Sequence, residues 1–138
     1  MPASDKVFTA GVGKPIDAKR QEIFYTFVAN RLFLSKRARP DIQQAIAVLA
    51  TRITNPNKGD WQKLIKLMKY LTGTADKVLT LKIEDITVIK WYMDASFAVH
   101  NNFKSHTGSV MTTGKGALQA ISRKQKLNTK SSTESKLV

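Results

Sequence analysis

Residues 91–98 read Trp91-Tyr92-Met93-Asp94-Ala95-Ser96-Phe97-Ala98, an apolar run that ends in one carboxylate and continues in small residues. The residues before it, from Ile86 onward, are mostly β-branched. Such a run is typical of a β-strand. We therefore expect a strand over residues 86–94, with Asp94 at its end as the chain's main candidate for chemistry.

Further strands are expected on either side of this one. Residues 106–112 and 117–123 both read as strands, and the connection between them, Thr113-Gly114-Lys115-Gly116, has the glycines of a hairpin. Three consecutive strands with short links predict an antiparallel meander. Upstream, residues 79–83 alternate apolar and polar side chains until Glu84-Asp85 interrupts the pattern.

Residues 20–75 follow a helical period instead. One helix is expected from Arg20 to the basic cluster at residues 36–39, and a second from Pro40-Asp41 to Asn55-Pro56. A third is expected to begin with Asp60 as its N-cap and to end at Gly73, in the left-handed conformation. The face that it is expected to bury consists of Trp61, Leu64, Ile65, Met68 and Leu71.

These patterns predict an α+β fold in which helices precede a three-stranded antiparallel meander. Residues 1–19 are polar, contain Pro2, Gly11, Gly13 and Pro15, and have no hydrophobic period, so we expect a flexible loop segment there. We divide the rest into a helical region over residues 20–75 and a second domain over residues 76–138.

The charge of the chain favours a polyanionic partner. Its 23 Lys and Arg residues against 10 Asp and Glu give a net charge of +13. Nucleic acid is the commonest such partner, because each phosphate contact releases a counterion. Lys63, Lys66 and Lys69 form a basic stripe on the third expected helix, which could follow a phosphate backbone. The alternative is a solvated face on a protein that is merely basic.

Several classes of function find no support in the composition. The chain has no cysteine, which excludes disulfides and thiolate metal sites. Its two histidines, His100 and His106, give no basis for a zinc site or for a Ser-His-Asp arrangement. No apolar run is long enough to span a bilayer. We expect an intracellular protein without a membrane partner, and the sequence does not distinguish cytoplasm from nucleus.

Six groups of residues carry a resemblance to a known family. In this order along the chain they resemble the Pol polyprotein of copia-type LTR retrotransposons, over roughly residues 20–138. No single group would be specific alone. They are Phe33-Leu34-Ser35 with Arg39-Pro40-Asp41-Ile42; Trp61 to Lys69 with Tyr70-Leu71-Thr72-Gly73-Thr74; Tyr92 to Ala98; Lys104-Ser105-His106-Thr107-Gly108; Ser122-Arg123-Lys124-Gln125-Lys126; and Lys130-Ser131-Ser132-Thr133-Glu134.

The resemblance implies a position inside a longer enzyme, an RNA-directed DNA polymerase with a ribonuclease H activity that hydrolyses the RNA of an RNA/DNA hybrid. Residues 20–75 would correspond to the thumb and connection region that grips a primer-template duplex. Residues 76–138 would be a truncated ribonuclease H-like domain, entering its first helix. The polymerase's paired aspartates are expected upstream of Met1. Ribonuclease H chemistry needs several carboxylates around two Mg²⁺ ions, and the resemblance implies that Asp94 is the first.

The second carboxylate is where this sequence departs from the family. The usual pattern after Ser-Ser-Thr is Glu-Ala-Glu, whose second Glu faces the metals, and here the run is Glu134-Ser135-Lys136. Glu134 is expected to form a capping box with Ser131, so it cannot replace the missing ligand. The other family carboxylates are expected beyond Val138. We therefore expect Asp94 to be a vestigial and weak Mg²⁺ ligand, and no functional cofactor or hydrolysis in this chain.

The leading hypothesis is a catalytically inactive fragment of a retrotransposon Pol polyprotein that still binds an RNA/DNA hybrid or a duplex. Its other partner would be the rest of the polyprotein, if the element is intact. A domesticated nucleic-acid-binding module and a purely structural α+β domain are the alternatives. The residues expected to contact nucleic acid are Lys36, Arg37, Arg39, Lys63, Lys66, Lys69, Lys104, Arg123, Lys124 and Lys126.

Overall fold

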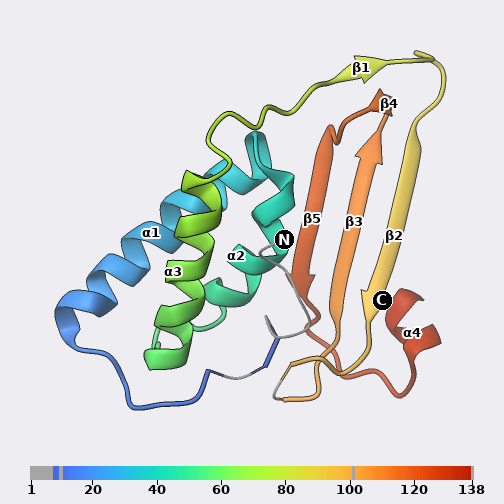
Figure 1. Cartoon of the computed structure of the whole chain (residues 1–138). Helices are drawn as coiled ribbons and strands as arrows, with labels where there is room; N and C mark the ends of the chain where they lie inside the picture. The colour runs from blue at the N-terminus through green and yellow to red at the C-terminus, as the bar shows by residue number, and fades with distance from the viewer. Residues whose placement is uncertain (1–7, 10, 101, 138) are drawn as a thin grey trace.

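The computed structural model describes residues 8–9, 11–100 and 102–137 of the chain. Within these residues a group of helices lies against one side of an antiparallel sheet, and a short helix lies beside the sheet's far edge strand, β2 (Figure 1). The fold is therefore mixed α+β, as predicted. The elements are α1 (Ala18–Arg37), η2 (Pro40–Ile42), α2 (Gln43–Ala50), α3 (Lys58–Thr72), β1 (Lys82–Ile83), β2 (Lys90–Ser96), β3 (His106–Thr112), β4 (Gly114–Lys115), β5 (Gln119–Lys124) and α4 (Ser132–Leu137).

The hydrophobic core lies among α1, α2 and α3. Apolar residues at helical spacing on each helix point inward, which is why the three helices pack together rather than remaining separate. The helices also contact the sheet, because Gln43 on α2 donates a side-chain hydrogen bond of 2.6 Å to the Ala120 carbonyl of β5. The buried core residues are Phe24, Val28, Ile42, Ala45, Ile46, Val48, Leu49, Leu64 and Leu67.

The main sheet confirms the predicted meander. Its strand order is β2-β3-β5, and both pairings are antiparallel. β3 has the predicted bounds, but β2 begins at Lys90 rather than at Ile86. The delay has a local cause, because Thr87 donates from its backbone N–H and its hydroxyl to Asp85 Oδ1, at 2.8 and 2.6 Å. This Asx turn competes with strand formation.

The glycine-rich connection between β3 and β5 differs from the expected tight hairpin. Its residues Gly114 and Lys115 form a short strand of their own, β4, which pairs with β1. Gly116 has a φ of +81°, and a Cβ atom there would lie 2.2 Å from the Thr80 carbonyl oxygen. The strand predicted over residues 79–83 is correspondingly reduced to Lys82–Ile83, the two residues that find a partner in β4.

Two predictions about the ends of α3 are wrong. The N-cap is Asn57 rather than Asp60, which lies at position N3 and closes a reciprocal capping box with Asn57. Asp60 is only 1% exposed, and it also pairs with Arg52 at 3.3 Å. At the other end Gly73 has a φ of −73°, so the helix ends without a left-handed residue.

The buried face of α3 is also shifted from the predicted one. Leu67 is 1% exposed, whereas Met68, predicted to be buried, is 42% exposed. The helix is rotated so that Leu64 and Leu67, three residues apart, face the core together.

The second predicted helix is divided and shorter than expected. It begins as a 3₁₀ turn at Pro40–Ile42 and ends at Ala50. The next residues form turns instead, since the Thr51, Arg52 and Ile53 N–H groups donate to carbonyls three residues earlier. The Thr51 hydroxyl also donates to the Val48 carbonyl at 2.7 Å, which occupies an acceptor that a longer helix would use.

The predicted N-terminal segment is only partly described, since residues 1–7 and 10 lie outside the described residues. Its described part contains no helix up to Asp17, whereas Ala18 and Lys19 already belong to α1, and it is attached to the connection between α2 and α3. The Ile16 N–H donates to the Pro56 carbonyl at 3.3 Å, and the Lys58 N–H donates to the Lys14 carbonyl at 3.1 Å. The domain boundaries at residues 19/20 and 75/76 stay predictions. Among the described residues, no helix has the length and apolar character to cross a membrane.

Candidate functional site

Asp94 lies on β2, the edge strand of the main sheet. In the register it faces Gly108 of β3, which in turn faces Ser122 of β5, so these three residues share one side of the sheet. Gly108 has no side chain to shield the carboxylate, and the Asp94 side chain is 79% exposed. The hydrogen bond from the Ala95 backbone N–H is the largest cause that lowers the pKa of Asp94, and the nearby Lys136 ammonium lowers it further. The carboxylate is therefore charged and open to solvent at neutral pH.

Lys136 is brought to Asp94 by α4. Its Nζ lies 3.3 Å from Asp94 Oδ1, and both side chains are mostly exposed. The sequence prediction placed this lysine where a second carboxylate would stand. In the structure the ammonium makes an ion pair with Asp94 rather than facing away from it.

A buried hydroxyl cluster fixes the position of α4. Ser135 is fully buried, and its Oγ lies 2.9 Å from Ser105 Oγ and 2.5 Å from Thr129 Oγ1. Gln125 donates from Nε2 to the Ser135 carbonyl at 2.7 Å. The side chain next to Ser135 is that of Lys136, so this cluster sets the direction in which the lysine leaves the helix.

The N-terminus of α4 has the predicted capping serine. The Glu134 N–H donates to Ser131 Oγ at 3.1 Å. The Glu134 carboxylate accepts from the Lys130 N–H at 2.7 Å, one residue earlier than in the predicted capping box. Because this contact engages the Glu134 carboxylate, Glu134 does not supply a second carboxylate beside Asp94.

The donor groups around Asp94 do not fit a Mg²⁺ ion. Magnesium takes six oxygen ligands and is held in enzymes by carboxylates and phosphates. Here one carboxylate faces an ammonium, and the part of the chain that the structure describes contains no group of three or more His, Cys, Asp or Glu residues that could hold a metal. The ancestral role of Asp94 as a metal ligand stays a prediction.

A groove of about 390 Å³ runs from Asp94 across the face of the sheet that α2 covers. Gln43 and Gln44 of α2 line one wall, and side chains of β2, β3 and β5 line the other, among them Tyr92 and Ser122. Its walls combine amide and hydroxyl groups with apolar side chains, and among the described residues that line it Asp94 carries a negative charge. The groove can therefore hydrogen-bond a polar molecule.

The two histidines form a buried pair that sequence reasoning missed. His100 Nε2 lies 3.0 Å from His106 Nδ1, and His106 Nε2 lies 2.7 Å from Ser122 Oγ. Phe8 makes edge contacts with both rings. Burial, and then the neighbouring His100, lowers the pKa of His106 to about 4. The imidazole of His106 is neutral at pH 7, and its contacts with His100 and Ser122 tie the loop before β3 to the sheet.

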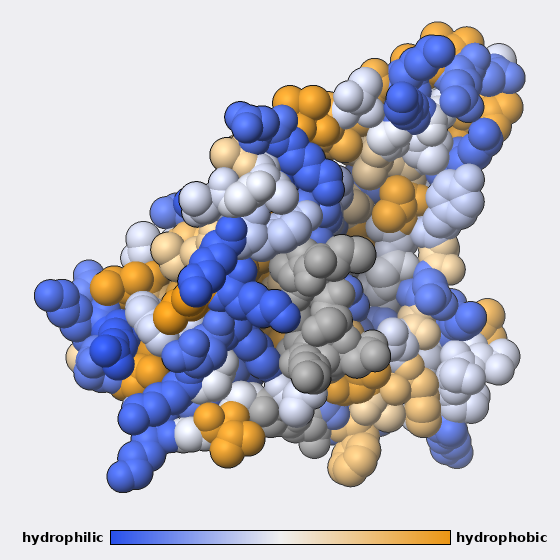
Figure 2. All heavy atoms as spheres, viewed as in Figure 1, coloured by the Kyte–Doolittle hydropathy of each residue, from blue (hydrophilic) through white to orange (hydrophobic). Residues whose placement is uncertain are grey.

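Most of the residues predicted to contact nucleic acid are exposed, on two parts of the surface. Lys36 and Arg37 end α1, and Lys66 and Lys69 lie on α3. Arg123 and Lys126 are exposed at the end of β5. Hydrophilic residues cover much of the helical layer in the view of Figure 2, interleaved with hydrophobic ones.

Lys63, Lys104 and Lys124 are only partly exposed. Lys63 donates to the Thr9 carbonyl, and Lys104 donates to the Lys126 carbonyl at 2.6 Å. The surroundings of Lys63 therefore differ from those of Lys66 and Lys69, with which it was predicted to form one basic stripe. It belongs instead to a pocket that it shares with Lys124.

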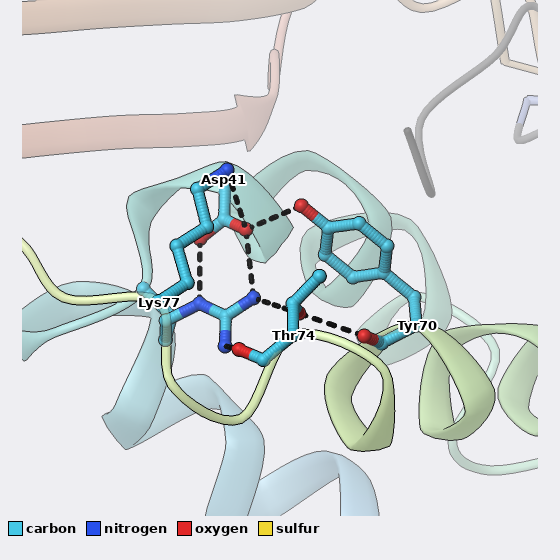
Figure 3. A network of polar contacts seen from close by, with 5 residues as sticks. Asp41, Tyr70, Thr74 and Lys77 are labelled. Atoms are coloured by element: carbon cyan, nitrogen blue, oxygen red, sulfur yellow. Dashed lines mark hydrogen bonds and ion pairs between the residues drawn. The ribbon is translucent and has the colours of Figure 1, made fainter.

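Arg39 is a correction to the predicted interface. It is 7% exposed, and its guanidinium donates to both carboxylate oxygens of Asp41, at 3.0 and 2.9 Å. Arg39 also donates to the Thr74 carbonyl at 2.9 Å (Figure 3). Tyr70 donates its hydroxyl to Asp41 Oδ2 at 2.8 Å, and Lys77 Nζ lies 3.9 Å from the same oxygen. The hydrogen bond from Arg39 is the main cause that lowers the pKa of Asp41. Arg39 is therefore engaged in holding η2 to the end of α3.

Comparison with known proteins finds homologues of one kind. A retrovirus-related Pol polyprotein from transposon TNT 1-94 of Nicotiana tabacum is 32% identical over 112 residues, which is 80% of this chain and 8% of the relative. Those from transposons RE2 and RE1 of Arabidopsis thaliana are each 31% identical over 97 residues, 70% of this chain and 7% of the relative. The chain thus spans less than a tenth of these relatives. No family profile and no solved structure matches it.

Proposed function

We propose that this chain, whose homologues are retrovirus-related Pol polyproteins of plant transposons, corresponds to the segment where a copia-type reverse transcriptase passes into its ribonuclease H domain. We further propose that it binds an RNA/DNA hybrid or duplex without cleaving it. The order of its motifs supports the assignment. So does a strand that carries Asp94, followed by two antiparallel strands and then a helix.

The single observation that carries the proposed lack of catalysis is the ion pair between Asp94 and Lys136. Two-metal hydrolysis needs carboxylates that concentrate negative charge on both sides of the scissile phosphate. An ammonium 3.3 Å from Asp94 does the opposite, because it neutralises the carboxylate and repels a divalent cation. A Mg²⁺ ion would have to displace Lys136 in order to reach the Asp94 carboxylate.

Binding to nucleic acid is supported by the exposed cations and by the net charge of +13. Phosphate contacts by such residues need no base recognition and lose affinity as salt rises. Arg39 is left out of the proposed surface because Asp41 and Thr74 occupy its guanidinium. The exposed members are Lys36, Arg37, Lys66, Lys69, Arg123 and Lys126.

The test combines binding and cleavage on one substrate, an RNA/DNA hybrid with labelled RNA. We expect saturable binding at low salt that weakens steeply as salt rises, and intact RNA after incubation with Mg²⁺ or Mn²⁺. Absence of binding at low salt would remove the nucleic-acid function. RNA cleavage that disappears in Asp94→Asn would show that the site is active.

A further inference from the structure

A small pocket lies apart from Asp94, where the connection after α2, the helix α3 and the end of β5 meet. Its volume is about 80 Å³, several times the roughly 10–15 Å³ that a single water molecule requires. It can therefore hold a small ion. The charged or titratable residues that line it are Arg52, Asp60, Lys63, His100 and Lys124.

Three cations from three separate elements line this pocket against one carboxylate. Arg52 follows α2, Lys63 belongs to α3, and Lys124 is the last residue of β5. The carboxylate, Asp60, is already engaged: its Oδ2 accepts from Arg52 Nε at 3.3 Å and from the Asn57 N–H at 3.2 Å. The pocket therefore keeps an excess of positive charge.

Lys124 is the cation that this arrangement leaves without compensation. It is half-buried, and within the described residues no hydrogen bond or ion pair joins its ammonium to an acceptor. Burial lowers its pKa, and the nearby charges of Lys104 and Arg52 lower it further. Burial also lowers the pKa of Lys63, which Asp60 partly offsets. Half-burying an ammonium beside like charges costs free energy unless an anion joins it.

The guanidinium of Arg52 offers further hydrogen-bond donors in the same pocket. Only its Nε is joined to Asp60, and no described residue accepts from its two terminal nitrogens. A guanidinium with free Nη groups beside an ammonium is a common arrangement for binding phosphate, because several donors meet several oxygens.

We propose that this pocket binds a tetrahedral oxyanion, a phosphate group held by Lys124 and by the terminal nitrogens of Arg52, with Lys63 adding positive charge. The phosphate can come from two sources, a free phosphate ion or the backbone of a nucleic acid. The second source rests on the proposed function above, and the first does not. Either source supplies negative charge that balances the three cations.

The experiment titrates the full chain with sodium phosphate at neutral pH and follows the His ring signals by NMR, with sodium chloride at matched ionic strength as the reference. His100 lines the pocket, and the charge of Lys124 is one cause of its lowered pKa. We expect a saturable shift of the His100 signal with phosphate alone. In Lys124→Gln we expect phosphate binding to weaken by about 10-fold, the loss of one charge-assisted hydrogen bond. Lys124→Arg should restore most of it.

The matched control is Lys115→Gln, which removes the same charge from an exposed residue on β4. It should bind phosphate like the unchanged chain. Equal phosphate binding by Lys124→Gln and Lys115→Gln, or a response to phosphate no larger than that to chloride, would overturn the proposal. Far-UV circular dichroism of each variant separates loss of the pocket from loss of the fold.

A second arm identifies the source of the phosphate by measuring hybrid binding over a range of salt. If a backbone phosphate enters the pocket, Lys124→Gln should reduce the slope of log affinity against log salt by about 0.9 relative to Lys115→Gln. Phosphate binding with equal slopes would support an oxyanion site for a free ion. Phosphate binding without any hybrid binding would support the pocket while removing the proposed function.

Discussion

Replacing Arg39 by Ala should destabilise the fold strongly while leaving the basic surface intact. The guanidinium makes two hydrogen bonds to Asp41 and two to Thr74, at 2.7 to 3.0 Å, from a side chain that is almost completely buried. Removing one partner of a buried pair typically costs about 3–5 kcal/mol. Asp41 would keep Tyr70 and Lys77 as partners, so we expect the lower end, about 3 kcal/mol.

The assay is urea and thermal denaturation, both monitored by circular dichroism. For a chain of this size, about 3 kcal/mol corresponds to a fall in melting temperature on the order of 10 °C. The control is Arg37→Ala, which removes an exposed arginine two residues away and should change the unfolding free energy by less than about 0.5 kcal/mol. Equal stabilities of the two variants would refute the structural role of Arg39.

The pH dependence of the same variant gives an independent check. Arg39 lowers the pKa of Asp41 from 3.8 in the folded state. A lowered folded-state pKa stabilises the fold above the unfolded pKa, and this contribution is lost as pH falls through the folded value. The stability difference between the unchanged chain and Arg39→Ala should therefore be full at neutral pH and shrink below about pH 4.

Three further predictions concern Asp94, the histidine pair and the basic surface. Lys136→Glu should raise the pKa of Asp94 and create saturable Mn²⁺ binding, measured by calorimetry and absent from the Asp94→Asn, Lys136→Glu double variant. Because burial lowers the pKa of His106 from 6.5 to about 4, the unfolded state binds more protons between these values. The unfolding free energy should therefore fall on acidification from pH 6.5 to pH 4, by about 3 kcal/mol at most, and an unchanged pH slope in His106→Asn would contradict this origin. Lys66→Gln and Lys69→Gln should each reduce the salt dependence of hybrid binding by about 0.9 in slope, whereas Lys115→Gln should leave it unchanged.

Patterns confined to neighbouring residues were the part of the fold that could be predicted. The strand predicted over residues 106–112 has the observed bounds His106–Thr112. The first helix was predicted from Arg20, two residues after its observed start at Ala18, where Asp17 accepts from the Arg20 N–H at 2.7 Å as an N-cap. Such features depend on a few side chains and on one backbone conformation, so the sequence contains all the information that determines them.

Features that depend on distant partners were predicted wrongly or missed. Asp60 reads as an N-cap, but Asn57 caps the helix and Asp60 is buried beside Arg52. The face of α3 is set by its packing against α1 and α2, which favours Leu67 over Met68. The two-residue pairing of β1 with β4 shortens a strand whose alternation alone suggested five residues.

In the candidate site, too, local features could be predicted from the sequence and contacts between distant residues could not. The identity of Lys136 in place of a carboxylate could be read directly, whereas its contact with Asp94 depends on the buried hydroxyls around Ser135. Arg39 lies in a basic cluster of the sequence, and only the positions of Thr74 and Tyr70 show that it is engaged inside the fold. The His100–His106 contact and the pocket at Lys124 join segments for which no local pattern indicates contact.

The measurement that tests the central claim most directly is the fate of labelled RNA in a hybrid bound by the purified chain. The assay contains saturating protein with Mg²⁺ or Mn²⁺, and binding is confirmed on the same sample. If Lys136 neutralises Asp94 and no second carboxylate completes the site, the hybrid is bound and its RNA stays intact in both the unchanged chain and Asp94→Asn. Cleavage by the unchanged chain that Asp94→Asn abolishes would contradict the account.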